Sequence, residues 1–181
     1  MTRPAMGVRS QGCDANRAQI LRSVGVFALK ITVFLLVAWA LLTWVFGIER
    51  CDGAGMSPAV HDGDVAVFYR LQGDYERGDV VVVNAPGRAV EPLRIAACPG
   101  DVVEICEQGV KVNGYLQQEP QVVEETLLPA YAAQGEIALG ENEYYVLGDG
   151  RMHASDSREF GPVCADEIEG IVVGLMRLRG F

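Results

Sequence analysis

The chain of 181 residues has a formal net charge of −9, and 50% of its residues are hydrophobic. Residues 1–48 hold 5 of the 15 basic side chains and 1 of the 24 acidic ones, so residues 49–181 hold 10 basic and 23 acidic side chains, a net charge of −13. So acidic a region argues against nucleic acid and anionic lipid headgroups as partners, because both bind basic surfaces.

The N-terminal third predicts one membrane-spanning helix. Residues 31–48 carry no charged side chain, and the apolar stretch extends back past Lys30 to Val24. About 20 apolar residues are enough to cross a bilayer, and a lysine near the end of a span can extend its ammonium group to the headgroups. We therefore divide the chain into an N-terminal segment, 1–23, an anchor, 24–48, and a domain, 49–181.

The charges that flank the anchor predict its orientation. Five basic residues and only one acid, Asp14, precede it, whereas residues 49–52 show no basic excess. The positive-inside rule places the N-terminus in the cytoplasm and the domain outside the cell membrane. A cleaved secretory signal is the alternative, but no small-x-small cleavage pattern precedes Cys51, which favours an uncleaved anchor.

Turns and short apolar runs predict an all-β domain over residues 49–181. The apolar runs lie at 65–69, 80–83, 102–105, 143–147 and 168–175, with glycine-aspartate or glycine-asparagine turns between them. Residues 110–112 before Asn113-Gly114 indicate a hairpin, because Asn-Gly suits a tight primed turn. No long 3.6-residue period occurs, so we expect an antiparallel β barrel or sandwich. Residues 107–140, irregular and acidic over 117–136, are expected to form an inserted excursion or small subdomain.

Four cysteines fall in the predicted outer domain, where disulfides persist. They are Cys51, Cys98, Cys106 and Cys164. Four cysteines allow three pairings, which sequence alone does not resolve; Cys98 and Cys106, which flank the turn at 99–101, are the favoured pair. Their spacing lacks the CxxC form of a zinc site, and we expect no metal and no cofactor.

Three blocks of the outer domain together resemble type I signal peptidases. Residues 53–58 read Gly-Ala-Gly-Met-Ser-Pro, where that family has Gly-x-Ser-Met-x-Pro with a nucleophilic serine. Residues 93–101 read Leu-Arg-Ile-Ala-Ala-Cys-Pro-Gly-Asp, where the family has Lys-Arg-Val-x-Gly-x-Pro-Gly-Asp with lysine as the general base. The nucleophile position is thus held by Gly55 and the general-base position by Leu93.

The third block, residues 148–158, reads Gly-Asp-Gly-Arg-Met-His-Ala-Ser-Asp-Ser-Arg, where the family has Gly-Asp-Asn-Arg-x-x-Ser-x-Asp-Ser-Arg. The serine that orients the lysine is replaced by Ala154. The resemblance implies a signal-peptidase-like antiparallel β core and an acid–arginine network that folds its loops. The network residues retained here are Asp149, Arg151, Asp156 and Arg158.

The three replacements predict a catalytically inactive site. A serine hydroxyl needs a neighbouring base, and leucine neither accepts a proton nor carries charge. Ser57 is a weak substitute, expected on the same face as the lost nucleophile if the segment is extended. It lacks a base, because Lys30 is in the anchor, Lys111 is in the hairpin, and His61 and His153 are expected in loops.

The resemblance implies a cleft that still holds an extended precursor segment. Its expected substrate-cleft residues are Gly53, Gly55, Met56, Ser57, Pro58, Leu93 and Arg94. The predicted function is that of a non-cutting factor that binds signal-peptide-bearing or pilin-type precursors, similar to the dyad-lacking relatives that assist sortase-dependent pilus assembly in Gram-positive bacteria. An active signal peptidase with an atypical site, and a structural scaffold acting through the acidic 117–136 segment, remain the alternatives.

Overall fold

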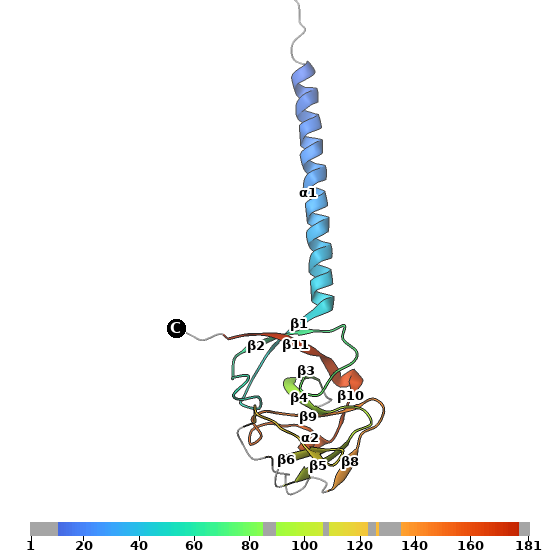
Figure 1. Cartoon of the computed structure of the whole chain (residues 1–181). Helices are drawn as coiled ribbons and strands as arrows, with labels where there is room; N and C mark the ends of the chain where they lie inside the picture. The colour runs from blue at the N-terminus through green and yellow to red at the C-terminus, as the bar shows by residue number, and fades with distance from the viewer. Residues whose placement is uncertain (1–10, 85–89, 107–108, 123–125, 127–134, 178–181) are drawn as a thin grey trace, which may run out of the picture. The chain divides into compact units, whose positions relative to one another are not determined.

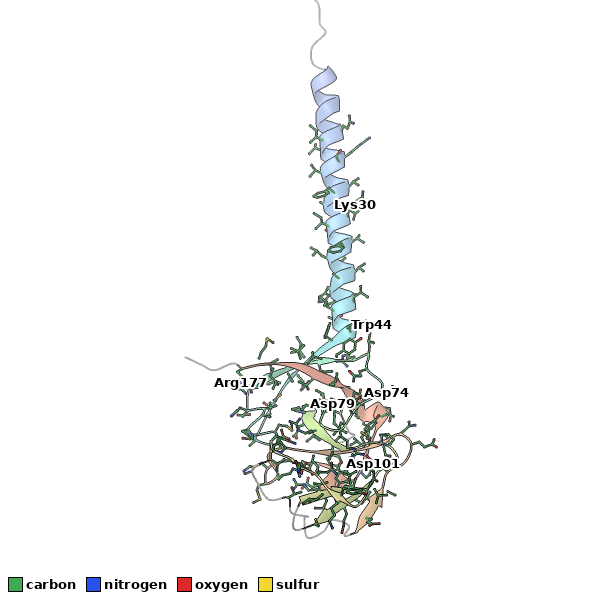
Figure 2. All side chains as sticks on the ribbon, viewed as in Figure 1. Lys30, Trp44, Asp74, Asp79, Asp101 and Arg177 are labelled. Atoms are coloured by element: carbon green, nitrogen blue, oxygen red, sulfur yellow. The ribbon has the colours of Figure 1, made fainter. Side chains whose placement is uncertain are left out.

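The computed structural model describes residues 11–84, 90–106, 109–122, 126 and 135–177, and its chain divides into two units, residues 1–43 and 44–181. Helix α1 (Gln11–Val45) is the long blue helix of Figure 1. Its part Gln19–Val45 is long and apolar enough to cross a membrane, with a mean hydropathy of 2.3 and none of that window buried by protein. Lys30 and Trp44 are both labelled on this helix in Figure 2.

The helix ends at Val45, three residues before the last residue of the predicted anchor, Ile48. Strand β1 (Phe46–Arg50) begins directly after Val45 and pairs antiparallel with β2 (Val65–Tyr69) along its whole length. The reason is local packing: Gly47 lies opposite Phe68, whose ring occupies the space that a side chain at position 47 would need. Strand pairing at Gly47 therefore overrides the apolar composition that predicted helix.

Seven strands of the described residues form one antiparallel sheet in the order β1-β2-β11-β3-β4-β9-β10. Besides β1 and β2, these are β3 (Val80–Val83), β4 (Glu91–Ala97), β9 (Glu143–Leu147), β10 (Val163–Cys164) and β11 (Ile168–Met176). Side chains alternate between two faces along each strand, and the valine run of β3 is buried over its last three residues. Apolar side chains therefore pack on both faces of the centre of this sheet.

A second sheet has the order β7-β6-β5-β8, with β5 (Val102–Cys106), β6 (Gly109–Val112), β7 (Tyr115–Leu116) and β8 (Glu136–Ala138). The predicted hairpin turn is present, since Asn113 and Gly114 have φ values of 53° and 80° between β6 and β7. The sheet includes β5, which lies before the predicted excursion at 107–140. Figure 1 shows β5, β6 and β8 side by side.

Two short helical turns, α2 (Ser157–Phe160) and η1 (Ala165–Glu167), complete the described elements. Every strand pair is antiparallel. The predicted fold class, an antiparallel β domain preceded by one N-terminal apolar helix, is confirmed.

The expected disulfides are not formed, and the favoured pairing of Cys98 with Cys106 was wrong. Cys51, Cys98, Cys106 and Cys164 are all free thiols. The Cys98 thiol donates to the Tyr75 carbonyl at 3.5 Å, and the Cys106 thiol donates to the Gly109 carbonyl at 3.4 Å. Cys98 directly follows β4, whereas Cys106 is the last residue of β5, and each thiol is directed to a different backbone carbonyl.

Candidate functional site

The first block lies on the loop that joins β1 to β2, residues 51–64. The Cys51 N–H donates to the Asp64 carbonyl and the Gly63 N–H donates to the Cys51 carbonyl, both at 2.8 Å. The Asp62 carboxylate accepts from the Gly53 N–H at 2.8 Å. The Asp64 carboxylate also accepts from the His61 N–H at 3.0 Å. These bonds close the loop on itself through its own backbone and two aspartates.

Two glycines bring the third block into contact with the first. The Gly150 N–H donates to the Gly55 carbonyl at 3.0 Å. A Cβ at position 148 would overlap the Gly55 carbonyl oxygen and the Ala154 methyl group, and a Cβ at position 150 would overlap the Ala54 carbonyl oxygen. The approach of the two blocks therefore requires glycine at 148 and 150.

Position 55 has no such requirement. Its backbone lies outside the positive-φ range that favours glycine. A Cβ built there would lie 3.4 Å from the Ala154 Cα, 3.6 Å from the Ala154 Cβ and 3.9 Å from a Glu91 carboxylate oxygen, all ordinary contacts. Gly55 and Ala154 are thus direct neighbours, and a Cβ atom fits at position 55 without overlap.

Leu93 lies in the hydrophobic core. It stands opposite Val81 in the β3–β4 pair and is 2% exposed. Its cluster also contains Ile95, Val146 and Tyr144. An ammonium group in this cluster would lose its hydration without gaining an ionic partner among these apolar side chains, whereas leucine packs there favourably.

A small hollow opens beside Gly55. It is lined by Cys51, Asp52, Gly53, Gly55, Met56, Val60, Glu91 and Pro92. Three of the seven predicted substrate-cleft residues, Gly53, Gly55 and Met56, line it. Ser57, Pro58, Leu93 and Arg94 do not belong to its described lining.

Sequence reasoning missed the contribution of β4 to this hollow. Glu91 and Pro92 line it from the first residues of the strand. Side-chain alternation was the signal that could have found Glu91, because it precedes Leu93 by two residues on the same strand. Cys51 was also missed as a lining residue; burial raises the pKa of its thiol, which keeps it protonated and weakly nucleophilic at neutral pH.

Ser57 does not share a pleat with Gly55, so the extended geometry expected for this segment was wrong. The Ser57 N–H donates to the Ala54 carbonyl at 3.0 Å and the Val60 N–H donates to the Met56 carbonyl at 2.8 Å, which makes the segment a series of turns. The reason is that a turn satisfies these backbone groups locally. His61 and His153 are both exposed and lie outside the helices and strands, in loops as expected.

The retained acid–arginine positions form ion pairs that connect the blocks. Arg94 holds Asp149 with two bonds, Nε to Oδ1 at 2.8 Å and Nη2 to Oδ2 at 2.6 Å, and donates to the Gly78 carbonyl at 2.7 Å. The hydrogen bond to Asp149 raises the pKa of Arg94. Because Arg94 adjoins Leu93 and Asp149 adjoins Gly148, this pair joins the second block to the third.

The second half of the third block is held by Asp156, Arg158 and Arg151. Asp156 accepts from the Arg158 Nε at 2.8 Å and from the Gly148 N–H at 3.1 Å. Arg158 in turn donates to the Arg151 carbonyl at 2.6 Å. The Arg151 guanidinium donates to the Gly148 carbonyl at 2.8 Å and reaches Glu119 and Thr126, each at 2.6 Å.

The described residues thus form an antiparallel β domain that follows one apolar helix, with a hollow where the loop of the first block meets the third block and β4. The sequence profile described as "Signal peptidase, peptidase S26" matches residues 24–176. The chain therefore belongs to the signal peptidase family, peptidase S26.

Individual relatives are similar at moderate identity. Signal peptidase I of Bacillus licheniformis is 27% identical over 138 residues, which cover 71% of this chain and 74% of that protein. Signal peptidase I T of Bacillus subtilis (strain 168) is 26% identical over 151 residues, 77% of this chain and 78% of that protein. The crystal structure of a signal peptidase I from Enterococcus faecalis V583 is 24% identical and aligns with a TM-score of 0.46, covering 55% of this chain and 97% of that one.

Proposed function

We propose that this chain is a signal peptidase I-like protein that binds precursor segments without cleaving them. One observation carries the proposal: the neighbouring positions 55 and 154 carry no hydroxyl, and position 93 is a leucine with 2% exposure in an apolar cluster. A serine peptidase needs a nucleophile and a base acting as a unit, and loss of either lowers turnover on the order of 10⁶-fold.

The contacts that shape the cleft do not involve catalytic side chains. The first and third blocks meet through the main-chain bond from Gly150 to Gly55, and the second and third blocks are joined by Arg94 and Asp149. An extended peptide that pairs with backbone groups needs only that the blocks keep their positions. These retained contacts support binding as the function that remains.

Signal-peptide-bearing proteins are the substrate class of the family, and we assign pilin-type precursors of a sortase-linked assembly system as the partners. The charge asymmetry around the apolar helix supports a cytoplasmic N-terminus and a domain at the outer membrane face, where exported precursors emerge. The proposed role is that of an assembly factor that holds a precursor beside the membrane.

Binding and cleavage can be measured on the same preparation. Full-length protein in detergent is incubated with a signal-peptide-bearing pilin precursor, and both the bound fraction and the cleaved product are quantified beside an active signal peptidase. We expect binding without product. Gly55→Phe should fill the hollow and abolish binding, whereas Gly73→Phe, at a position with nothing within 4 Å of its Cβ site, is the matched control.

The alternatives give different results. Cleavage by the wild-type protein that is lost in Ser57→Ala would indicate an active peptidase with an atypical site. Unchanged binding in Gly55→Phe, together with loss of partner recruitment after charge reversal in the acidic 117–136 segment, would indicate a scaffold. Failure to bind any pilin precursor, with unchanged pilus polymers in a deletion strain, would overturn the proposal.

A further inference from the structure

The polar side chains of residues 19–30 gather on one side of α1. A groove on that side is lined by Gln19, Arg22, Ser23, Val26, Phe27 and Lys30. Counted from Gln19, these residues follow the three- and four-residue steps that keep side chains on one face of a helix. The other positions of this stretch are all apolar: Ile20, Leu21, Val24, Gly25, Ala28 and Leu29. The first part of the apolar helix therefore has one polar side.

The two cations of this groove differ from the other described basic residues. Every other lysine or arginine whose side chain is described lies 3.9 Å or less from a carboxylate oxygen, whereas Arg22 and Lys30 form no ion pair with a described residue. Asp14, the one acid of residues 1–48, precedes Arg22 by eight positions, and ion pairs along a helix join positions three or four apart. The groove therefore carries two positive charges that the described protein does not neutralise.

Helix geometry directs both cations to one end of the candidate span. Lys30, labelled in Figure 2, lies eight residues beyond Arg22, a rise of about 12 Å along the axis. The Cα–Cβ bonds of a helix tilt toward its N-terminus, so the long side chain of Lys30 leads back toward Arg22. A lysine inside a span extends its ammonium group to the headgroup layer in the same direction. Val26, between the two, provides an apolar wall.

We propose that this groove binds one anionic phospholipid in the leaflet that holds the N-terminal end of α1. The lipid phosphate lies between Arg22 and Lys30, and the upper part of an acyl chain lies against Val26 and Phe27, which are 53% and 66% exposed. The candidate span begins at Gln19, so the groove is at the level where headgroups and acyl chains meet. The proposal does not depend on whether the site cleaves.

Charge and position favour a lipid over an acidic transmembrane helix as the occupant. Basic side chains at the end of a span attract anionic lipids at the membrane surface. A phospholipid brings an anion and a hydrocarbon chain together, which matches a groove that has cations at two levels and an apolar wall between them. A partner helix would have to hold a carboxylate inside the membrane, where ionised groups are costly.

Native mass spectrometry of the full-length protein in detergent tests the proposal. The protein is titrated with phosphatidylglycerol or with phosphatidylcholine of the same acyl chains, and the bound lipids are counted. We expect one phosphatidylglycerol to bind in preference to phosphatidylcholine. Arg22→Gln and Lys30→Gln should each weaken that binding roughly five-fold, the effect of one basic residue near an anionic surface. Equal binding of the two lipids by the wild type would overturn the proposal.

A charge-moved variant separates the groove from general attraction between a basic segment and anionic lipid. Lys30→Gln combined with Ala28→Lys keeps the net charge and nearly the same depth, but it moves the cation to the apolar side of the helix. Binding should stay as weak as in Lys30→Gln alone, and recovery to the wild-type level would overturn a groove site. The melting temperature of the β domain should not change in any variant, because the substituted residues lie in the unit 1–43.

Two further outcomes concern the identity of the ligand. Excess inorganic phosphate should not displace the lipid, because it has no acyl chain to contact Val26 and Phe27; displacement would identify a free anion as the ligand and overturn the lipid assignment. A membrane protein that copurifies with the wild type and is lost in Lys30→Gln, while phosphatidylglycerol binding is unchanged, would identify an acidic transmembrane partner instead and would also overturn it.

Discussion

The triple substitution Gly55→Ser, Leu93→Lys and Ala154→Ser is expected to restore part of a peptidase site, with nearly all of the stability cost at position 93. A side chain at 55 meets Ala154 at 3.4 Å and 3.6 Å, so Gly55→Ser should change the free energy of unfolding by no more than about 0.5 kcal/mol. Leu93→Lys removes a buried leucine worth about 1.5–3 kcal/mol and desolvates an ammonium group as well. This is a large part of the roughly 5–15 kcal/mol that stabilises a typical domain.

The cost at position 93 should depend on pH. Burial lowers the pKa of a lysine, while in the unfolded chain it keeps its ordinary pKa of about 10.4. Between those two pKa values the unfolded chain binds more protons, so the free energy of unfolding of Leu93→Lys should rise with pH. Leu93→Met, an uncharged control of similar volume, should lose less than about 1.5 kcal/mol and show no such rise.

The assay compares precursor cleavage by the wild type, the three single variants and the triple variant in detergent, with an active signal peptidase as positive control. The wild type and single variants should be inert, because one missing member of a catalytic unit costs on the order of 10⁶-fold. Cleavage by the triple variant would mean that the loops still hold catalytic geometry. A folded triple variant that binds precursor and does not cut would refute that reasoning, and a cutting wild type would refute the assignment of the site.

Three further predictions concern the loop network and the core. Asp149→Asn should lower the free energy of unfolding by about 3–5 kcal/mol in denaturant titration, because it leaves the Arg94 guanidinium without its ionic partner; a loss below 1 kcal/mol, as for a surface ion pair, would contradict this. Gly150→Ala should cost about 1–3 kcal/mol through backbone overlap, and Gly73→Ala, which meets nothing within 4 Å, should be neutral; equal melting temperatures would argue against the close approach of the blocks. Tyr145→Phe should be neutral or stabilising, because the buried hydroxyl has no hydrogen-bond partner among the described residues and burial raises its pKa to about 12; marked destabilisation would indicate a bond to that hydroxyl.

Local chemistry explains which parts of the fold were predictable. Strands β2, β3 and β9 begin and end at the predicted residues, because each is a short apolar run bounded by turn residues. The hairpin at Asn113 follows from the positive φ that this dipeptide adopts readily. Strand β1 could not be predicted, because its apolar residues also suit a membrane helix and the decision depends on a distant contact with Phe68.

The sequence predicted the three blocks that form the site, but it did not predict which residues line the hollow. Motif positions indicated that Gly55 and Ala154 lie in the same site, and in the structure they are direct neighbours. Side-chain alternation from Leu93 points to Glu91 only if β4 extends that far, and no motif specifies where this strand begins. The orientation of Ser57 depends on a turn whose hydrogen bonds form only once the loop has closed.

The Arg151 guanidinium connects the segment between β7 and β8 to the third block through hydrogen bonds. Its three bonds reach Glu119 and Thr126 on one side and the Gly148 carbonyl on the other. The position of the turn that supports Gly55 therefore depends on Glu119 and Thr126, two side chains that lie outside all three sequence blocks.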